Sequence, residues 1–253
     1  MLLQELDHYL RSHLAIDELQ AVDKSLNGIQ VGRRTQDVRR VACAVDACAE
    51  TFDRAAEWGA DVLVVHHGLY WGRVLPLTGE HYERIRKLMD ADIALYAVHL
   101  PLDMHPEFGN NAEMAKALHL KETKPFGKYH GYEIGVSGRL EPAVRREEVV
   151  DSLFADLGNP LAVLPFGPEM VSSVGIVSGG AVFEVEQAIE QGLDLYITGD
   201  ASHTVYHRCM EAGINVVFGG HYATEVWGPR ALGERVAKDL GLETSFIDVP
   251  TGL

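Results

Sequence analysis

The chain has 253 residues, of which 37 are acidic, 22 are Lys or Arg and 12 are His, so its formal charge is −15. This balance argues against a nucleic-acid-binding domain, because phosphate binding needs a surplus of cations. The apolar content of 47% excludes a disordered chain, and three cysteines are too few for a disulfide-stapled secreted scaffold. No apolar stretch reaches the roughly 18 residues that a membrane span needs, so we expect a soluble, cytoplasmic protein that binds neither membranes nor nucleic acids.

Apolar residues recur at helical spacing through residues 1–14, which predicts an amphipathic helix. From about Val38 onward, short runs rich in Val, Ile and Leu alternate with segments of helical length. The expected strands are 41–45, 62–65, 93–98, 174–177, 193–198 and 214–218. The expected helices lie near 50–58, 80–91, 110–118, 183–192, 202–212 and 223–240. Apolar strands between helices are typical of βαβ units and a mostly parallel sheet.

Residues 125–168 depart from this rhythm and predict antiparallel strands around one helix. Both halves of the chain repeat the order strand, Gly or His turn, helix. We therefore expect an α/β fold of two related lobes with mostly parallel strands flanked by helices. The first lobe is predicted to comprise residues 1–124 and 217–253, and the second residues 125–216.

Imidazoles and carboxylates follow four of the predicted strands. In chain order they are His66 and His67, His99 and Asp103, Asp200 and His203, and His221 and Glu225. A single histidine at a strand end is usually a hydrogen-bonded structural group. Because ligands bind outside the carboxyl ends of parallel strands, the joint pattern predicts a site there, between the two lobes.

The residue types favour a divalent metal, because imidazole and carboxylate bind first-row ions and no cysteine joins the cluster. The candidate ligands are His66, His67, Asp103, His221 and Glu225. A catalytic zinc ion takes about three protein ligands, so five ligands predict two ions about 3.5–4 Å apart with a bridging carboxylate. Zn, Mn, Fe, Co and Ni all suit this donor set.

Five motifs carry a family resemblance. They are NGIQVG at 27–32, VVHHGLYW at 64–71, HLPLDMHPEFGNNA at 99–112, TGDASH at 198–203 and GGHYATEVWG at 219–228. With them the chain resembles, over nearly its full length, the YbgI-type (Nif-three-like) dinuclear metal-binding proteins, often named GTP cyclohydrolase type 2. The resemblance implies that the five candidates are metal ligands, with Glu225 bridging, and that His99, His105 and His203 line the site. It also implies a toroidal homohexamer and a short form without an inserted middle domain.

We expect from this a metal-dependent hydrolase in which a metal-bound hydroxide attacks a small substrate such as a nucleotide. His99 and His203 are the candidate catalytic residues, since imidazole can carry protons near neutral pH. The alternative is a non-catalytic protein that handles metal or acts in regulation, because no substrate-reading motif accompanies the ligands.

Two further features have alternative interpretations. The Gly-rich turn at 174–181 could cradle a phosphate, but it lacks both the G-x-G-x-x-G spacing and a Walker lysine, which favours a plain tight turn. Tyr70, Trp71 and Trp227 lie beside the metal motifs in the sequence. They could stack on a substrate ring, although packing is the commoner role of such residues.

Overall fold

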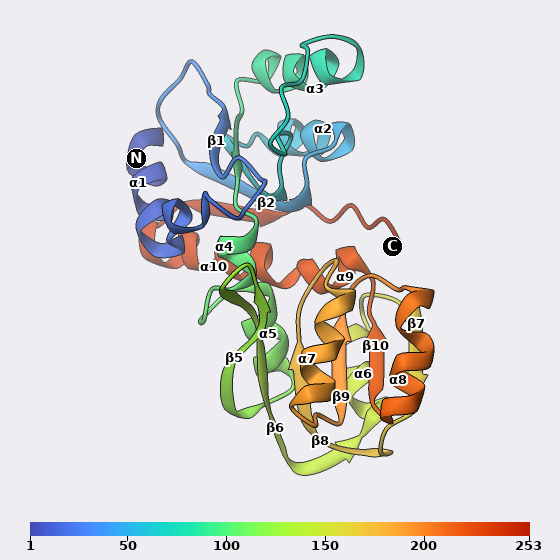
Figure 1. Cartoon of the computed structure of the whole chain (residues 1–253). Coiled ribbons are helices and arrows are strands. Elements are labelled where there is room, and N and C mark those ends of the chain that lie inside the picture. Colours follow the sequence, from blue (N-terminus) through green and yellow to red (C-terminus); the bar gives the residue numbers. More distant parts are fainter. The chain divides into compact units, whose positions relative to one another are not determined.

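The computed structural model describes residues 1–253, and its internal contacts divide the chain into two compact units. Unit 1 comprises Met1–Leu102 and Gly228–Val249, and unit 2 comprises Asp103–Trp227 and Pro250–Leu253 (Figure 1). In the lobes predicted from the sequence, the chain instead passes into the second lobe after residue 124 and returns to the first after residue 216. Helix α5 (Asn110–Ala117) packs against the sheet of unit 2, which accounts for the earlier position of the first boundary.

Unit 1 is built on a five-stranded sheet in the order β1-β4-β3-β2-β11. Its strands are β1 (Gly28–Val31), β2 (Arg40–Asp46), β3 (Val62–His67), β4 (Ala94–Ala97) and β11 (Glu243–Phe246). The edge strand β1 pairs antiparallel with β4, and the other three pairings are parallel. The sheet is therefore mostly parallel, as the continuous apolar runs predict.

Helices cover both faces of this sheet (Figure 1). They are α1 (Leu3–Leu14), the 3-10 turn η1 (Ile16–Leu19), α2 (Ala49–Trp58), α3 (Gly79–Asp90) and most of α10 (Trp227–Leu240). Alternate strand residues such as Leu63 and Leu95 form a core with Phe52 of α2 and Leu88 of α3. On the opposite face, the Tyr96 hydroxyl donates a hydrogen bond to Asp7 of α1.

Unit 2 contains a six-stranded sheet in the order β5-β6-β8-β9-β10-β7. Its strands are β5 (Lys121–Tyr129), β6 (Tyr132–Arg145), β7 (Ala162–Pro165), β8 (Met170–Ile176), β9 (Leu195–Thr198) and β10 (Asn215–Phe218). The central strands β8, β9 and β10 are parallel, and the flanking pairings are antiparallel. The antiparallel segment expected at 125–168 supplies those flanks.

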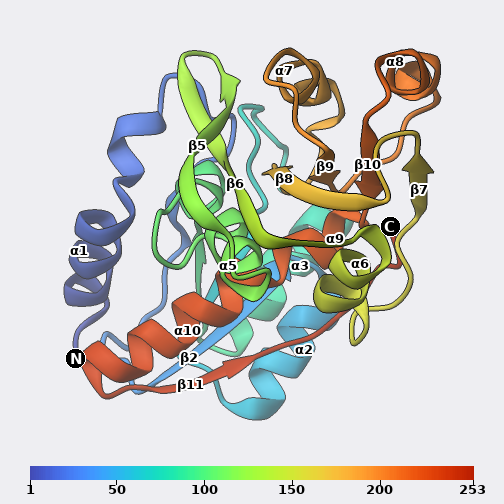
Figure 2. The ribbon, with the colours of Figure 1, turned by 90° about the horizontal axis from the view of Figure 1, so that it is seen from below.

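Helices also flank the second sheet. They are α5, α6 (Arg146–Phe154), η2 (Val182–Glu184), α7 (Val185–Glu190), η3 (His203–Val205), α8 (Tyr206–Ala212) and α9 (His221–Glu225). Figure 2 shows α7 and α8 on one face of the strands and α6 on the other. The short helix α4 (Leu100–Asp103) lies where unit 1 passes into unit 2. The predicted class, α/β with two sheets flanked by helices, is confirmed.

The parallel register aligns the strand ends within each unit. In unit 1, Ala44 pairs with Val65 and Val65 with Ala97, so β2, β3 and β4 end at one edge of their sheet. In unit 2, Ile176, Ile197 and Val217 are aligned in the same way across β8, β9 and β10. In each sheet, the polar residues of the loops that follow these strands therefore lie at one edge. No helix of the chain combines the length and the apolar character needed to cross a membrane.

Candidate functional site

Three histidines gather at the strand ends of unit 1. His66 and His67 are the last residues of β3, and His99 follows β4. Their ligand nitrogens lie within 4.8 Å of one another, and the ring centroids of His66 and His99 are 5.1 Å apart. His66 is fully buried, whereas His67 and His99 are partly exposed. We call these three residues the histidine cluster.

An oxygen acceptor holds the Nδ1 atom of each ring in the histidine cluster. His66 Nδ1 lies 3.0 Å from the carbonyl oxygen of Val98, His67 Nδ1 lies 2.8 Å from Asp46, and His99 Nδ1 lies 2.8 Å from Asp23. A carbonyl or an ionised carboxylate can only accept, so Nδ1 carries the hydrogen and the lone pair of each neutral ring is on Nε2. Metal-binding histidines are typically oriented by such partners.

Asp23 is the most strongly anchored of these acceptors. Its side chain is completely buried and also accepts hydrogen bonds from Ser25, Asn27 and the backbone of Leu100. Burial by itself raises the pKa of Asp23, but the hydrogen bonds, led by that of His99, outweigh it and lower the pKa. Asp23 therefore stays ionised and fixes the ring of His99.

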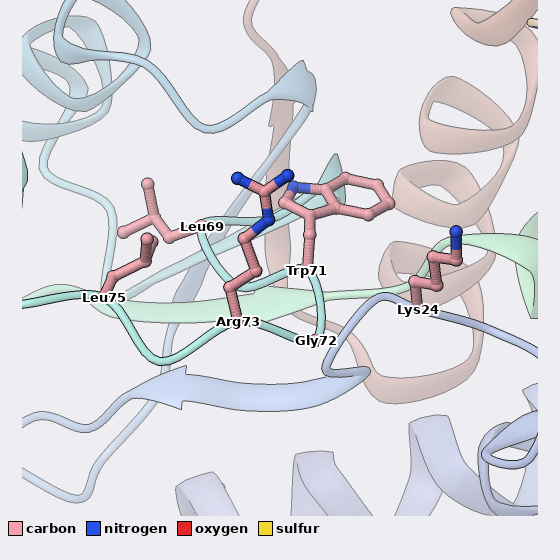
Figure 3. Close-up of a pocket in the computed structure, with 6 residues that line it drawn as sticks. All are labelled: Lys24, Leu69, Trp71, Gly72, Arg73 and Leu75. Carbon is pink, nitrogen blue, oxygen red and sulfur yellow. The ribbon is translucent and has the colours of Figure 1, made fainter.

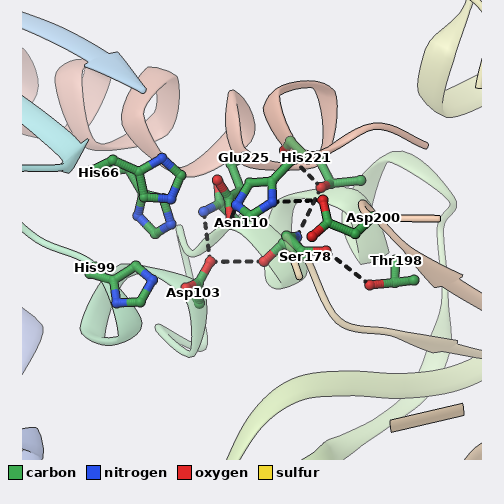
Figure 4. A network of polar contacts seen from close by, with 12 residues as sticks. His66, His99, Asp103, Asn110, Ser178, Thr198, Asp200, His221 and Glu225 are labelled. Atoms are coloured by element: carbon green, nitrogen blue, oxygen red, sulfur yellow. Dashed lines mark hydrogen bonds and ion pairs between the residues drawn. The ribbon is translucent and has the colours of Figure 1, made fainter. Parts of the chain in front are cut away.

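Unit 2 gathers a second group, which we call the acidic cluster: Asp103, His221 and Glu225. Asp103 is buried, and its Oδ1 accepts hydrogen bonds from Asn110 Nδ2 at 2.9 Å and from Ser178 Oγ at 2.8 Å (Figure 4). These two hydrogen bonds fix the position of the carboxylate. Ser178 follows β8, so the end of that strand sets the position of Asp103.

His221 is held between two carboxylates. Its Nδ1 lies 2.9 Å from Asp200 and its Nε2 lies 3.2 Å from Glu225, whose side chain is 3% exposed. Burial of His221 favours the neutral ring, yet Glu225 and Asp200 together raise its pKa to about 10. The negative charge that holds a proton on this ring equally favours a metal cation at Nε2.

The Gly-rich turn forms a cradle for Glu225. Gly179 has a φ of +66°, and a Cβ atom there would lie 2.2 Å from Glu225 Oε1 and 3.2 Å from His221 Nε2. Its N–H donates to Thr224 Oγ1, and the N–H of Ser178 donates to Asn111. Because both amides already have partners within the chain, the structure favours the tight-turn interpretation over a phosphate cradle.

The other two predicted site-lining histidines differ from His99 in their surroundings. His203 is exposed in η3, and its ring contacts that of His207, with 6.3 Å between centroids. His105 stacks on Phe108 at 3.6 Å, and its Nδ1 accepts the N–H groups of Glu107 and Phe108. His105 therefore stabilises its own loop, and the catalytic role of His203 stays a prediction.

Sequence reasoning named Asp200 as a carboxylate after a strand, but it did not identify the other residues that orient the ligands. Asp23 and Asp46 orient histidines in unit 1, and Asp200, Asn110 and Ser178 hold members of the acidic cluster. Asp46 and Asp200 carry a weak sequence signal, since each lies at or just after the end of a predicted strand. Asp23 carries none, because it precedes the first sheet strand by several residues.

The two clusters contain the chemistry that divalent metals require. Oriented imidazoles with Nε2 lone pairs and buried carboxylates are first-row metal ligands, and Gly179 provides space that a Cβ would fill. The fold and clusters thus define an α/β protein with candidate metal-binding groups. The chain belongs to the Duf34/NIF3 (NGG1p interacting factor 3) family, whose model matches residues 1–252.

Similar proteins agree with this membership. A relative from Treponema pallidum, named GTP cyclohydrolase 1 type 2 homolog, is 41% identical, with both chains fully covered. The crystal structure of TTHA1606 from Thermus thermophilus matches with a TM-score of 0.91 and 38% identity over all of both chains. The structure of protein ybgI, described as of unknown function, matches with a TM-score of 0.91 and 33% identity over the same full lengths. The resemblance deduced from the motifs is confirmed.

Proposed function

We propose that this chain is a metal-dependent hydrolase of small substrates that holds two divalent ions. The proposed ligands are His66 and His67 from the histidine cluster, and Asp103, His221 and Glu225 from the acidic cluster. The observation that carries the proposal is the oxygen acceptor at Nδ1 of each ligand histidine. Five protein ligands exceed the roughly three of a single catalytic zinc ion, which favours two ions.

The chain's own residues supply a proton carrier. When bound, divalent ions activate water and polarise the substrate oxygen. Asp23 holds the proton of His99 on Nδ1, so Nε2 can take a proton from the attacking water and return it to the leaving group. His203 is retained as a second candidate for this role, although its ring contact is with His207.

The substrate is proposed to be small and nucleotide-like. A pocket of about 510 Å³ opens beside Asp103 within unit 2 and is also lined by His105, Lys124 and Tyr132. This volume is typical of small-molecule sites. The relatives named GTP cyclohydrolase 1 type 2 homolog make hydrolytic opening of a purine ring the first reaction to test.

Metal analysis tests the ligand assignment. Protein purified without a metal-affinity step should contain two first-row ions per chain by plasma mass spectrometry. His67→Ala and His221→Ala should each lower the metal content, whereas the matched control His207→Ala, at an exposed histidine of α8, should not. Equal metal content in all three variants would contradict the assignment.

Turnover tests the catalytic part of the proposal. Protein loaded in turn with Zn, Mn, Fe, Co or Ni should hydrolyse at least one substrate among GTP, other nucleotides and simple phosphoesters, and His99→Ala should slow that reaction. Full metal occupancy without turnover would instead favour a metal-handling protein, which should pass its ions to an acceptor protein or chelator. Light scattering of the same samples tests the expected homohexamer.

A further inference from the structure

A second pocket opens in unit 1 beside the histidine cluster. Its volume is about 640 Å³, within the range of roughly 300–1,000 Å³ of small-molecule sites. It is lined by Lys24, Leu69, Trp71, Gly72, Arg73 and Leu75. Figure 3 shows the side chains of Lys24, Trp71 and Arg73 projecting to the same side of the loops that carry them.

The lining of this pocket is positively charged in a strongly acidic chain. Lys24 and Arg73 contribute two cations, no acidic residue lines the pocket, and neither cation forms an ion pair. Asp23, the neighbour of Lys24 in sequence, is buried and bonded to His99, so its carboxylate does not face the pocket. Two unpaired cations on the rim of a concave surface attract an anion such as phosphate.

Trp71 connects this pocket with the histidine cluster. Its indole is held by a hydrogen bond from Nε1 to the Gly68 carbonyl at 2.9 Å, and it meets the His99 ring edge to face at 5.0 Å. Its ring centroid also lies 5.7 Å from that of His67. The residue nevertheless remains 37% exposed, so a positioned aromatic surface faces the pocket. Such a surface favours the flat face of another ring.

We propose that this pocket binds a phosphorylated heteroaromatic compound, with its ring on Trp71 and its phosphate attracted by Lys24 and Arg73, which Figure 3 shows near the two ends of that indole. The proposal deepens the proposed function and rests on it in one respect, that the bound compound is the substrate of the metal-dependent reaction. The pocket beside Asp103 is less suited to the phosphate. Its lining contains a single lysine, Lys124, together with the two acidic residues Asp103 and Glu133.

Calorimetry on the full-length chain tests the pocket with three probes: GMP, guanosine and ribose phosphate. GMP should bind most tightly, because guanosine lacks the phosphate and ribose phosphate lacks the ring. Added salt should weaken the binding of GMP and ribose phosphate but not that of guanosine, since only the anionic probes interact with Lys24 and Arg73. Measurements on metal-loaded and metal-stripped protein separate this pocket from the metal ligands.

Variants then assign the contacts. Lys24→Ala and Arg73→Ala should each weaken the binding of GMP about tenfold, which is the loss expected for one charge-assisted hydrogen bond. Neither substitution should change the affinity for guanosine. Trp71→Leu should weaken the binding of both GMP and guanosine. The matched control Lys121→Ala, which removes an exposed cation of β5 that lines neither pocket, should leave GMP binding unchanged. The proposal is overturned if GMP does not bind at millimolar concentration, or if the Lys24→Ala/Arg73→Ala double variant binds it as the wild type does.

These binding experiments can fail or succeed separately from the tests of the metal-dependent reaction. GMP binding that depends on Lys24 and Arg73 in a chain that binds no metal would support this pocket and refute the metal-dependent reaction. The chain could instead bind two ions and turn over substrate while its affinity for GMP does not depend on Lys24 or Arg73. That result would support the metal-dependent reaction and refute the proposed pocket.

Discussion

Substitution of Gly179 by alanine tests whether the turn after β8 shapes the acidic cluster. The perturbation has two components, a backbone one and a steric one. The residue has a φ of +66°, a conformation that costs a residue with a Cβ about 1–2 kcal/mol. The new Cβ would also lie 2.2 Å from Glu225 Oε1, so the carboxylate must retreat by more than about 1 Å to reach ordinary contact.

The steric component is expected to be the larger one. Glu225 is 3% exposed, and its Oε1 lies 3.2 Å from His221 Nε2. Displacing it weakens a buried charge-assisted contact, which costs about 1–3 kcal/mol more. Gly179→Ala should therefore lower the free energy of unfolding by about 2–5 kcal/mol in total. Its metal content should fall as well, because the displaced group is a proposed ligand.

Gly192→Ala is the matched control. Gly192 has almost the same φ, +65°, but an added Cβ there meets nothing within 4 Å. Both glycines belong to unit 2, so the same urea transition, followed by circular dichroism, reports on both. Gly192→Ala should lose only the backbone part, about 1–2 kcal/mol, and keep its metal. Equal losses of stability and equal metal content in the two variants would refute the cradle argument.

Three further changes test individual features. Asp46→Asn removes the charge that orients His67 and should weaken metal binding about 10- to 100-fold, as measured by competition titration with a chelator. An unchanged metal affinity would contradict the orienting role of Asp46. Hydrogen bonds, chiefly from the side chain of the neighbouring loop residue Thr35, lower the pKa of Asp92 from 3.8 to about 2. Ionised Asp92 thus stabilises the fold above that ordinary value, and the stabilisation is lost as pH falls toward 2. In the Asp92→Asn variant, the melting temperature should fall less steeply as the pH is lowered toward 2. The same steepness in wild type and variant would contradict the stabilising role of ionised Asp92. Burial raises the pKa of Cys43 to about 12, so a thiol reagent should label the half-buried Cys48 in native protein and reach Cys43 only after unfolding.

The main elements could be predicted because they bury continuous apolar runs. The run at 62–65 becomes β3, fully buried until His67, and the run at 214–218 becomes β10. The strands missed were β1 and β11, two short edge strands of the first sheet. Neither shows a long apolar run, because an edge strand has one neighbour and these two are only half-buried. Pairing with β4 and β2, rather than local propensity, defines them.

The candidate ligands could be predicted for a related reason. The rule that parallel strands carry ligands at their carboxyl ends selects His66, His67 and His221 without any three-dimensional information. The carboxylates that orient them could not be found in this way. Asp23 reaches His99 across 76 positions of sequence, and Asp46 reaches His67 across 21, so only the tertiary pairing brings them together. Sequence spacing has no simple relation to such contacts.

The acid surplus of the chain has two different consequences in unit 1. Asp23 and Asp46 lie behind histidines, where they set the tautomer and add negative charge that favours a cation at Nε2. In the pocket that Trp71 also lines, the charge is of the opposite sign, with Lys24 and Arg73 and no acidic residue. A cation at the histidines and an anionic group in the pocket can therefore both be held beside one indole. If the proposed substrate binds as inferred, Trp71 both separates the two charges and positions the ring between them, so Trp71→Leu should impair turnover more than it impairs metal binding.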